Sequence, residues 1–230
     1  MKNKFFNKTK DLIFPKVDLT DVKGVLIDLD NTLYALTEEI YNLALHKVYL
    51  LFYKQRPMTE DEFVRYFDKF YQDNLSFYGD RPEAHNRYFV FQKIAEFLSI
   101  PFPFLLAEQA NKIFRKTILK NISCDKKALA FLRKCQRLKI PVCLVTDAYA
   151  AMQIEKLKAL NVEKYITFMV SDDETGHDKP YPAMFETALA KMSKLPEQVI
   201  MIGDDTKKDI EGAQKIGIKT YQVILTCNTR

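Results

Sequence analysis

The sequence has no apolar run long enough to span a membrane. Its basic, aromatic start at residues 1–6 also lacks the unbroken apolar stretch of a signal peptide, and we expect a frayed tail there. No long run of lysine and arginine is present, so the formal charge of +5 fits small anionic ligands better than nucleic acid. Internal repeats and low-complexity tracts are absent as well. We therefore expect a cytoplasmic protein with no membrane span and no nucleic-acid partner.

The cysteines lack the paired spacing of a metal-binding site. They are Cys124, Cys135, Cys143 and Cys227, and the second and third lie in apolar surroundings, where buried free thiols are common. Such a set favours a reduced, intracellular compartment. The length of 230 residues suits one large domain or a core with a smaller companion, and 47% apolar with 28% charged residues is ordinary for a globular protein.

One stretch, residues 25–34, places two carboxylates directly after an apolar run. Alternate residues of an extended strand point to one face, so Asp28 and Asp30 are predicted to project together where the strand ends. A strand this apolar is typical of a parallel sheet buried on both sides. The two carboxylates repel and raise each other's pKa unless a cation lies between them, and the hard, oxygen-seeking ion Mg²⁺ suits that place. The alternative is a strand followed by an Asp-rich turn.

Between residues 37 and 120 the apolar positions recur with the period of helices. Four helices are predicted: at 37–55, from residue 59, after the break at 79–82, and after the prolines at 101 and 103. Helices of this length joined by short turns form a compact bundle. We predict an all-α four-helix cap domain at 37–120, inserted after the first strand. Its aromatic stripes are expected to form the bundle core, with a surface that stacks a nucleobase as the alternative.

From residue 121 onward, helical and strand patterns alternate. Strands are predicted at 141–147, 166–171, 198–203 and 219–225, in addition to the first at 22–30, with helices at 125–139, 149–160, 182–192 and 206–216. Such alternation implies right-handed crossovers and a parallel sheet covered by helices on both faces. We predict an α/β fold with a doubly wound, parallel, five-stranded Rossmann-like core. It comprises residues 21–36 and 121–230, after an N-terminal lead at 1–20.

Polar side chains follow four of the predicted strands at corresponding positions. In chain order they are Asp28 and Asp30, then Thr146 and Asp147, then Lys179, and finally Asp204, Asp205 and Asp209. In open α/β sheets, ligands bind at the carboxyl ends of the strands, near a switch in strand order. Each cluster alone is a weak signal, but four at one edge of a sheet predict a functional site.

These segments resemble the four motifs of the haloacid dehalogenase superfamily. Residues 28–32, Asp-Leu-Asp-Asn-Thr, are similar to its first motif, Thr146 to its second, Lys179 to its third, and residues 203–209 to its fourth. The flanking residues are typical of subfamily I, whose members carry a helical cap between the first two motifs. The resemblance covers the chain from about residue 21 to the end, although in the cap it is one of architecture only.

The resemblance implies a Mg²⁺-dependent phosphatase of small phosphorylated metabolites that forms an aspartyl-phosphate intermediate. Asp28 is implied to be the nucleophile, and Asp30 the acid and then the base. The implied Mg²⁺ ligands are Asp28, the backbone carbonyl of Asp30, and Asp204. Thr146 and Lys179 are implied to bind the phosphoryl group, and Lys179 also to compensate the charge of the nucleophile.

The resemblance also assigns supporting positions. Asp209 is implied to orient a metal-bound water or the motif lysine, and Asp205 to share that task, with a helix-start acid as its equal alternative. Tyr34 is predicted to touch the substrate. Asp147 stands where many relatives have Asn, which adds an acid near the anion site, and is predicted to contact the substrate. Lys208 also stands where Asn is frequent.

Several alternatives remain open at this stage. A phosphomutase of the β-phosphoglucomutase type shares the four motifs but returns the phosphoryl group to a sugar, and a pyrimidine nucleotidase-like activity would be a narrower phosphatase. A dehalogenase is disfavoured because that chemistry normally lacks an acid at the position of Asp30. A scaffolding protein on an inactive core is disfavoured because the motif residues are intact. A monomer or a homodimer is expected.

Overall fold

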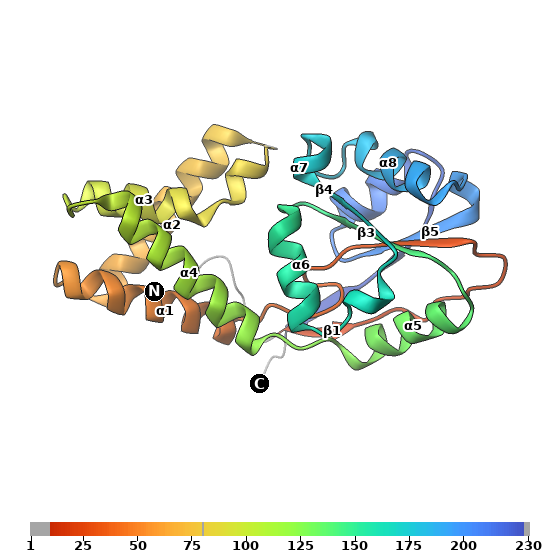
Figure 1. Ribbon diagram of the computed structural model, residues 1–230, viewed down its shortest axis with the longest axis horizontal. Helices are drawn as coiled ribbons and strands as arrows, with labels where there is room; N and C mark the ends of the chain where they lie inside the picture. Colours follow the sequence, from red (N-terminus) through yellow and green to blue (C-terminus); the bar gives the residue numbers. More distant parts are fainter. Residues whose placement is uncertain (1–9, 80, 228–230) are drawn as a thin grey trace. The chain divides into compact units, whose positions relative to one another are not determined.

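The computed structural model describes residues 10–79 and 81–227, which divide into two compact units (Figure 1). One is helical and comprises the described part of residues 37–121; the other comprises residues 10–36 and 122–227 and contains every strand described. The predicted domain boundaries, with a cap at 37–120 and a lead at 1–20, stay predictions. No helix in the described ranges combines the length and apolar character needed to cross a bilayer.

The second unit has the predicted α/β fold. Its five parallel strands lie in the order β4-β3-β2-β5-β6 and are β2 (Gly24–Ile27), β3 (Val142–Thr146), β4 (Phe168–Ser171), β5 (Val199–Gly203) and β6 (Lys219–Gln222). The chain builds outward from β2 to β3 and β4, and then returns to add β5 and β6 on the other side of β2. This reversal of strand order is the switch point at which open α/β sheets bind ligands. The predicted fold class is confirmed.

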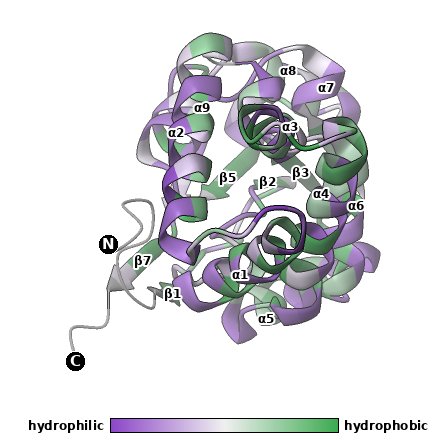
Figure 2. Cartoon of the chain, turned by 90° about the vertical axis from the view of Figure 1, so that its left-hand side faces the viewer, coloured by the Kyte–Doolittle hydropathy of each residue, from purple (hydrophilic) through white to green (hydrophobic). Residues whose placement is uncertain are grey.

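The central strands are apolar along their whole length because helices cover both of their faces. Val25, Leu26 and Ile27 are all fully buried although alternate residues of a strand point to opposite sides. On one side, Leu26 packs in a core with Met184 and Phe185 of helix α8 (Pro182–Met192). Figure 2 shows β2, β3 and β5 in the colour of hydrophobic residues. The strand pattern therefore reflects burial on both faces, as parallel sheets require.

The remaining helices of this unit are the crossovers and short turns between strands. They are α5 (Lys126–Arg137), α6 (Ala150–Ala159), η2 (Glu163–Tyr165), α7 (Asp172–Thr175), η3 (Pro196–Gln198), η4 (Thr206–Glu211) and α9 (Gly212–Gln214). The helix predicted at 206–216 is a π-helical turn in η4 that continues into α9. Single π turns of this kind are frequent at functional sites.

The last predicted strand, at 219–225, is two strands in the structure. Strand β6 ends at Gln222, and β7 (Ile224–Cys227) pairs antiparallel with β1 (Lys10–Ile13) in a separate two-stranded sheet. The break lies at Val223, whose N–H donates to the carbonyl of Gly203. The strand pattern of residues 219–225 cannot reveal such a change of partner, and β1 itself falls within the predicted lead.

The helical unit contains α1 (Glu38–Gln55), α2 (Glu60–Tyr78), the short η1 (Pro82–His85), α3 (Arg87–Phe97) and α4 (Pro103–Asn121). The hydroxyls of Thr37 and Thr59 cap α1 and α2, and Thr59 forms a capping box with Glu62. The aromatic stripes are core: Phe63 and Phe67 are fully buried within this unit. The packing agrees with the expectation of a bundle core.

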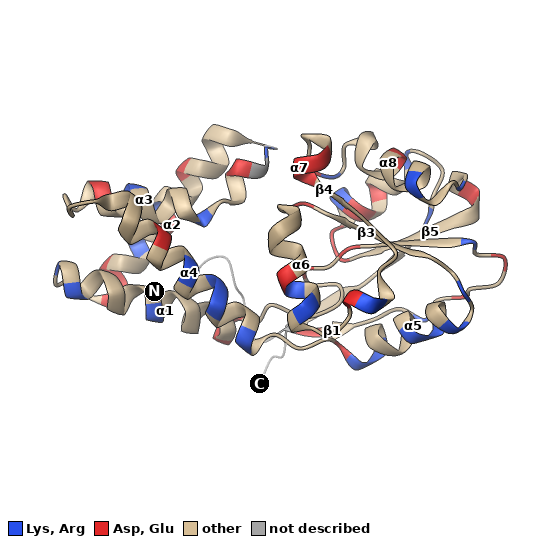
Figure 3. Ribbon diagram, viewed as in Figure 1, with Lys and Arg blue, Asp and Glu red and all other residues tan. Residues whose placement is uncertain are grey.

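A buried carboxyl group lies just past β4. Asp172, the first residue of α7, is fully buried, and neither of its side-chain oxygens has a hydrogen-bond partner. Figure 3 shows the acidic residues that gather on this short helix. Burial, together with the charge of Asp178, raises the pKa of Asp172 to about 7. The folded protein therefore holds this proton up to a higher pH than the unfolded chain does.

We predict that Asp172→Asn makes stability less dependent on pH. Because the folded pKa lies above the unfolded value, the wild type loses stability as pH rises from about 4 to about 7, and Asn has no proton to lose. The free energy of unfolding of the variant relative to wild type should rise by on the order of 1–3 kcal/mol between pH 5 and pH 8. Thermal unfolding at both pH values measures this, with the exposed Asp73→Asn as the matched control. A relative stability that stays constant with pH would contradict the assignment.

Candidate active site

The first acidic segment leaves β2 at the centre of the sheet. The Asp28 N–H donates to the carbonyl of Ile202 at 2.9 Å, which ties this residue to the end of β5. Asn31 then takes a φ of 62°, a left-handed conformation that Asn tolerates better than most residues. The N–H of Leu33 closes the turn on the carbonyl of Leu29 at 2.9 Å. Asp28 is thereby buried at the end of the strand, with only 6% of its surface exposed.

Lys179 lies at the centre of the site. Its ammonium donates to Asp28 Oδ1 at 2.7 Å, to Asp209 Oδ1 at 2.7 Å and to the carbonyl of Val145 at 3.0 Å. Its side chain is almost fully buried, and burial alone would lower the pKa of the ammonium. The charges of Asp209 and Asp28 outweigh burial and raise the pKa of Lys179 well above its usual value. Lys179 is therefore a permanent cation within the site.

Three carboxylates surround this one cation. Oxygens of Asp28, Asp204 and Asp209 lie within 4.8 Å of one another. Burial, and then the neighbouring acids, raise the pKa of Asp28 well above its usual value, although Lys179 opposes the shift. Burial and the charge of Asp209 raise the pKa of Asp204 to about 7. One ammonium against three carboxylates leaves excess negative charge, so a hard cation fits this donor set.

The two oxygens of Asp209 are already engaged. One accepts from Lys179, and the other accepts from the N–H of Asp205 at 3.1 Å. A Cβ atom at Gly203 would collide with the Asp209 carboxylate, so this close approach requires glycine at the end of β5. Asp209 is accordingly placed to hold the lysine, and Asp28 and Asp204 as metal ligands stay a prediction.

The Asp30 carboxylate has a different set of partners. Lys156 Nζ contacts its two oxygens at 2.7 and 2.6 Å, Gln153 Nε2 donates to Oδ2 at 3.0 Å, and the Tyr34 hydroxyl donates to Oδ1. Burial raises the pKa of Asp30, but Lys156 and the hydrogen bonds from Gln153 and Tyr34 outweigh it and lower the pKa to about 2. Tyr34, predicted to touch the substrate, is itself almost fully buried.

Thr146, at the end of β3, is buried, and its hydroxyl oxygen accepts from Gln153 Nε2 at 2.5 Å. Sequence reasoning gave Gln153 and Lys156 no role. Both lie on α6, three residues apart and therefore on one face of the helix. That spacing is the only signal in the sequence, and it does not reveal which face meets the strand ends.

The two departures from the family pattern, Asp147 and Lys208, form an ion pair. Lys208 Nζ lies 2.9 Å from Asp147 Oδ2 and 3.2 Å from Asp178 Oδ2. The other oxygen of Asp147 accepts from the backbone N–H of Lys179 at 2.8 Å. The protein therefore uses both oxygens of Asp147, and a substrate contact by this residue stays a prediction.

Asp205 is the N-cap of η4. Its carboxylate accepts from the N–H groups of Lys207 and Lys208, each at 2.9 Å. This is the helix-start role weighed as the alternative for Asp205. The predicted role behind the metal and the lysine stays a prediction.

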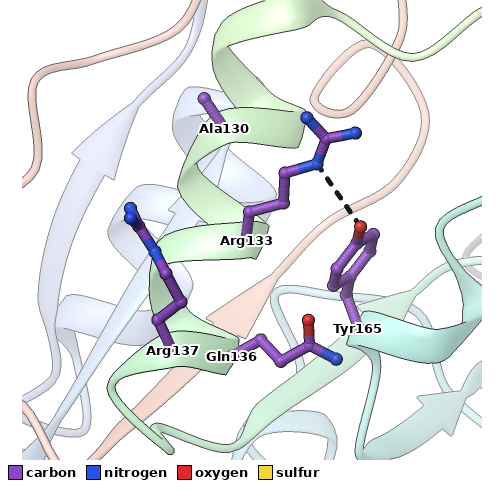
Figure 4. A pocket seen from close by; sticks show the side chains of 5 residues that line it. All are labelled: Ala130, Arg133, Gln136, Arg137 and Tyr165. Carbon is purple, nitrogen blue, oxygen red and sulfur yellow. Dashed lines mark hydrogen bonds between the residues drawn. The ribbon is translucent and has the colours of Figure 1, made fainter.

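A hollow lies elsewhere on this unit, away from the carboxylate cluster. Figure 4 shows that Arg133, Arg137 and Gln136 of α5 line it together with Tyr165, and the Arg133 Nε donates to the Tyr165 hydroxyl at 3.4 Å. The C-terminal end of α5 precedes β3, and Tyr165 precedes β4, so these residues lie toward the amino ends of the strands. The hollow contributes nothing to the cluster at the carboxyl ends.

We predict that Lys208→Met lowers the free energy of unfolding by about 2 kcal/mol, because it removes the ammonium that contacts the largely buried carboxylates of Asp147 and Asp178. Adding Asp147→Asn should recover part of this loss, since it removes one of the two charges that Lys208 contacts. Chemical denaturation measures both variants. Lys207→Met, at the exposed neighbouring lysine, should change stability by less than about 0.5 kcal/mol. Strictly additive effects of the two substitutions would disprove the pairing.

Comparison with known proteins identifies the family of this chain. A haloacid dehalogenase-like hydrolase family profile matches residues 25–223. Ribulose-1,5-bisphosphate 5-phosphatase of Halopiger xanaduensis is 26% identical over 201 residues, which cover 86% of this chain and 82% of that protein. Glyceraldehyde 3-phosphate phosphatase of Methanopyrus kandleri is 27% identical over 207 residues, covering 88% and 84%.

A solved structure supports the same fold. The crystal structure of 2-haloacid dehalogenase from Pseudomonas syringae pv. Tomato DC3000 superposes with a TM-score of 0.71 at 21% identity, over 87% of this chain and 86% of that one. The match at this identity concerns the fold alone. Assignment to subfamily I stays a prediction, whereas the family profile spans most of the chain. The chain belongs to the haloacid dehalogenase-like hydrolases.

Proposed function

We propose that this protein is a Mg²⁺-dependent phosphatase, a phosphoric monoester hydrolase that acts on small phosphorylated metabolites. The observation that carries the proposal is the buried contact of Lys179 with Asp28 and Asp209, beside Asp204. A dianionic phosphate can be attacked by a carboxylate only where fixed positive charge compensates both. Two relatives over most of the chain are phosphatases of phosphorylated sugars and trioses by name, which favours that class of substrate.

Asp28 is the proposed nucleophile. Its carboxylate oxygen attacks phosphorus, a P–O bond forms on Asp28, and the P–O bond to the leaving oxygen breaks. Asp30 gives its proton to the leaving oxygen and afterwards takes one from the water that attacks the aspartyl-phosphate. That second attack releases inorganic phosphate and restores the Asp28 carboxylate.

The proposed acid, Asp30, must carry a proton, but the groups that contact it favour its ionised form. With Lys156 beside it, Asp30 has a pKa of about 2 and is ionised at neutral pH. A phosphate dianion brought next to it adds negative charge, which raises the pKa of the carboxyl group. Asp30 is therefore proposed to take up its proton when substrate binds.

The carboxylates of Asp28 and Asp204, with the backbone carbonyl of Asp30, are the proposed Mg²⁺ ligands. When bound, Mg²⁺ supplies charge that screens carboxylate from phosphate and withdraws electrons from the phosphoryl group. Thr146, with the backbone N–H that follows it, and Lys179 are the proposed donors to the phosphoryl oxygens. Asp209 holds the lysine in place through its 2.7 Å contact.

Phosphate release from p-nitrophenyl phosphate and from a panel of phosphorylated sugars and trioses, with Mg²⁺ and with EDTA, tests the reaction class. We expect release that requires Mg²⁺. Isomerisation of a hexose phosphate without net phosphate release would instead identify a phosphomutase. The absence of both reactions would refute an enzyme of either kind.

We predict that Asp28→Asn lowers kcat by at least about 10³-fold, because the amide cannot form the aspartyl-phosphate. Acid-quenched wild-type enzyme should carry one phosphoryl group on the peptide that contains Asp28, as read by mass spectrometry, and the variant should carry none. Asp21→Asn, at an exposed acid of the same unit, should keep wild-type activity. Full activity of the Asp28 variant would exclude the mechanism.

A separate prediction concerns the metal. Asp204→Asn should raise the Mg²⁺ concentration needed for half-maximal activity by about 10-fold or more, because an amide is a weaker ligand than a carboxylate. The control is Asp21→Asn, at an exposed acid outside the cluster, which should leave the Mg²⁺ requirement near that of wild type. Equal Mg²⁺ requirements in the two variants would argue against Asp204 as a ligand.

A further inference from the structure

Several hydrogen bonds restrain the position of the Asp30 carboxylate. Three donors from two elements converge on it: the Lys156 ammonium contacts both of its oxygens, the Gln153 amide contacts one, and the Tyr34 hydroxyl contacts the other. The two Lys156 contacts, at 2.7 and 2.6 Å, fix the plane of the carboxylate as well as its position.

This ion pair is not an ordinary surface pair. The Lys156 side chain is only 15% exposed and Asp30 is 36% exposed, so the lysine gives up most of its hydration to make the contact. Exposed pairs contribute little because each side chain keeps its freedom and salt screens them. A largely buried lysine with both oxygens of one carboxylate has lost that freedom, which points to a positional role.

Gln153 provides an independent observation. Its side chain is fully buried, and the same Nε2 that reaches Asp30 also donates to the Thr146 hydroxyl oxygen at 2.5 Å. Its Oε1 is buried without a hydrogen-bond partner, which destabilises the folded state. The opposite orientation of the amide would set its oxygen against the ionised carboxylate of Asp30, although the Thr146 hydroxyl could donate to it. The present orientation leaves the side-chain carbonyl of Gln153 unsatisfied and allows its amide nitrogen to link Asp30 to Thr146.

We infer that Lys156, together with Gln153, is a positioning residue that orients the carboxyl group of Asp30 for proton transfer to the leaving oxygen. This inference rests on the proposed function and extends it to α6, which supplies none of the groups proposed to react. Lys156 fixes the plane of the carboxyl group, and Gln153 fixes its position relative to Thr146. The proton moves from Asp30 to the leaving oxygen as the P–O bond breaks, and Lys156 itself stays charged throughout.

A misoriented acid matters most when the leaving group needs its proton. Phenol is a poorer leaving group than p-nitrophenol, so cleavage of phenyl phosphate depends more on the acid than cleavage of p-nitrophenyl phosphate. The two esters are otherwise similar in shape and charge. The ratio of kcat/KM for the two esters therefore isolates the proton transfer, because kcat/KM covers the steps up to transfer to Asp28.

The experiment compares wild type, Lys156→Met, Lys156→Arg and Lys158→Met on both esters with saturating Mg²⁺. Lys156→Met should lower kcat/KM for phenyl phosphate about 10-fold more than for p-nitrophenyl phosphate. Lys156→Arg, which keeps the charge and the donors, should restore most of that difference. Lys158→Met, at an exposed lysine on the same helix, should leave both values unchanged. Gln153→Met provides a second test should Lys156→Met fail to fold, and is expected to shift the ratio in the same direction.

The outcomes separate this inference from the proposed function. A wild-type protein that hydrolyses neither ester would overturn both. A wild-type protein that hydrolyses both esters, combined with equal losses for the two in Lys156→Met, would overturn only the positioning role and leave Lys156 a structural residue. An unchanged kcat/KM of Lys156→Met on phenyl phosphate would also overturn the positioning role.

Discussion

The ammonium of Lys179 is the interaction on which the site depends. It receives one partner from each of three neighbouring strands: Asp28 follows β2, Val145 belongs to β3, and Asp209 follows β5. Removing an ammonium from water is costly, and the cost is offset only when each of its donors is used and opposite charges are close. Lys179 meets both conditions. The same contacts hold two mutually repelling carboxylates close together, so the geometry of the acids and the burial of the lysine require each other.

A second ammonium, that of Lys208, compensates acidic side chains beside the first. Lys208 neutralises Asp147 and contacts Asp178, while Asp147 also accepts from the backbone of Lys179. Asp147, the acid that departs from the family pattern, is thus paired with Lys208, the base on η4 that also departs from it. With Asp147 compensated in this way, the excess negative charge of the site is concentrated at Asp28 and Asp204. That is where a divalent cation would have the most effect.

Much of this arrangement could be predicted from the sequence because it follows from alternation along the chain. Apolar runs followed by polar residues locate the strand ends, and the topology of parallel sheets gathers those ends at one edge. Contacts between elements are harder to predict. The pattern of residues 219–225 does not show that Val223 separates two strands with different partners. Nor does the periodicity of α6 distinguish Lys156, which meets Asp30, from the exposed Lys158 two residues later.

Asp28 and Asp30 show why identical side chains two residues apart can have different chemistry. The strand period predicts that they project together, but β2 ends at Ile27, and the turn that follows gives each carboxylate its own neighbours. Burial and adjacent acids raise the pKa of Asp28, whereas Lys156 and its companions lower that of Asp30 to about 2. Environments that drive the pKa values of two carboxyl groups apart are the usual basis for a division of roles between them. In the protein by itself these shifts run opposite to the proposed roles, because a nucleophile must be ionised and an acid must carry a proton. The proposed roles therefore depend on the charges that a bound cation would bring to Asp28 and a bound phosphate to Asp30.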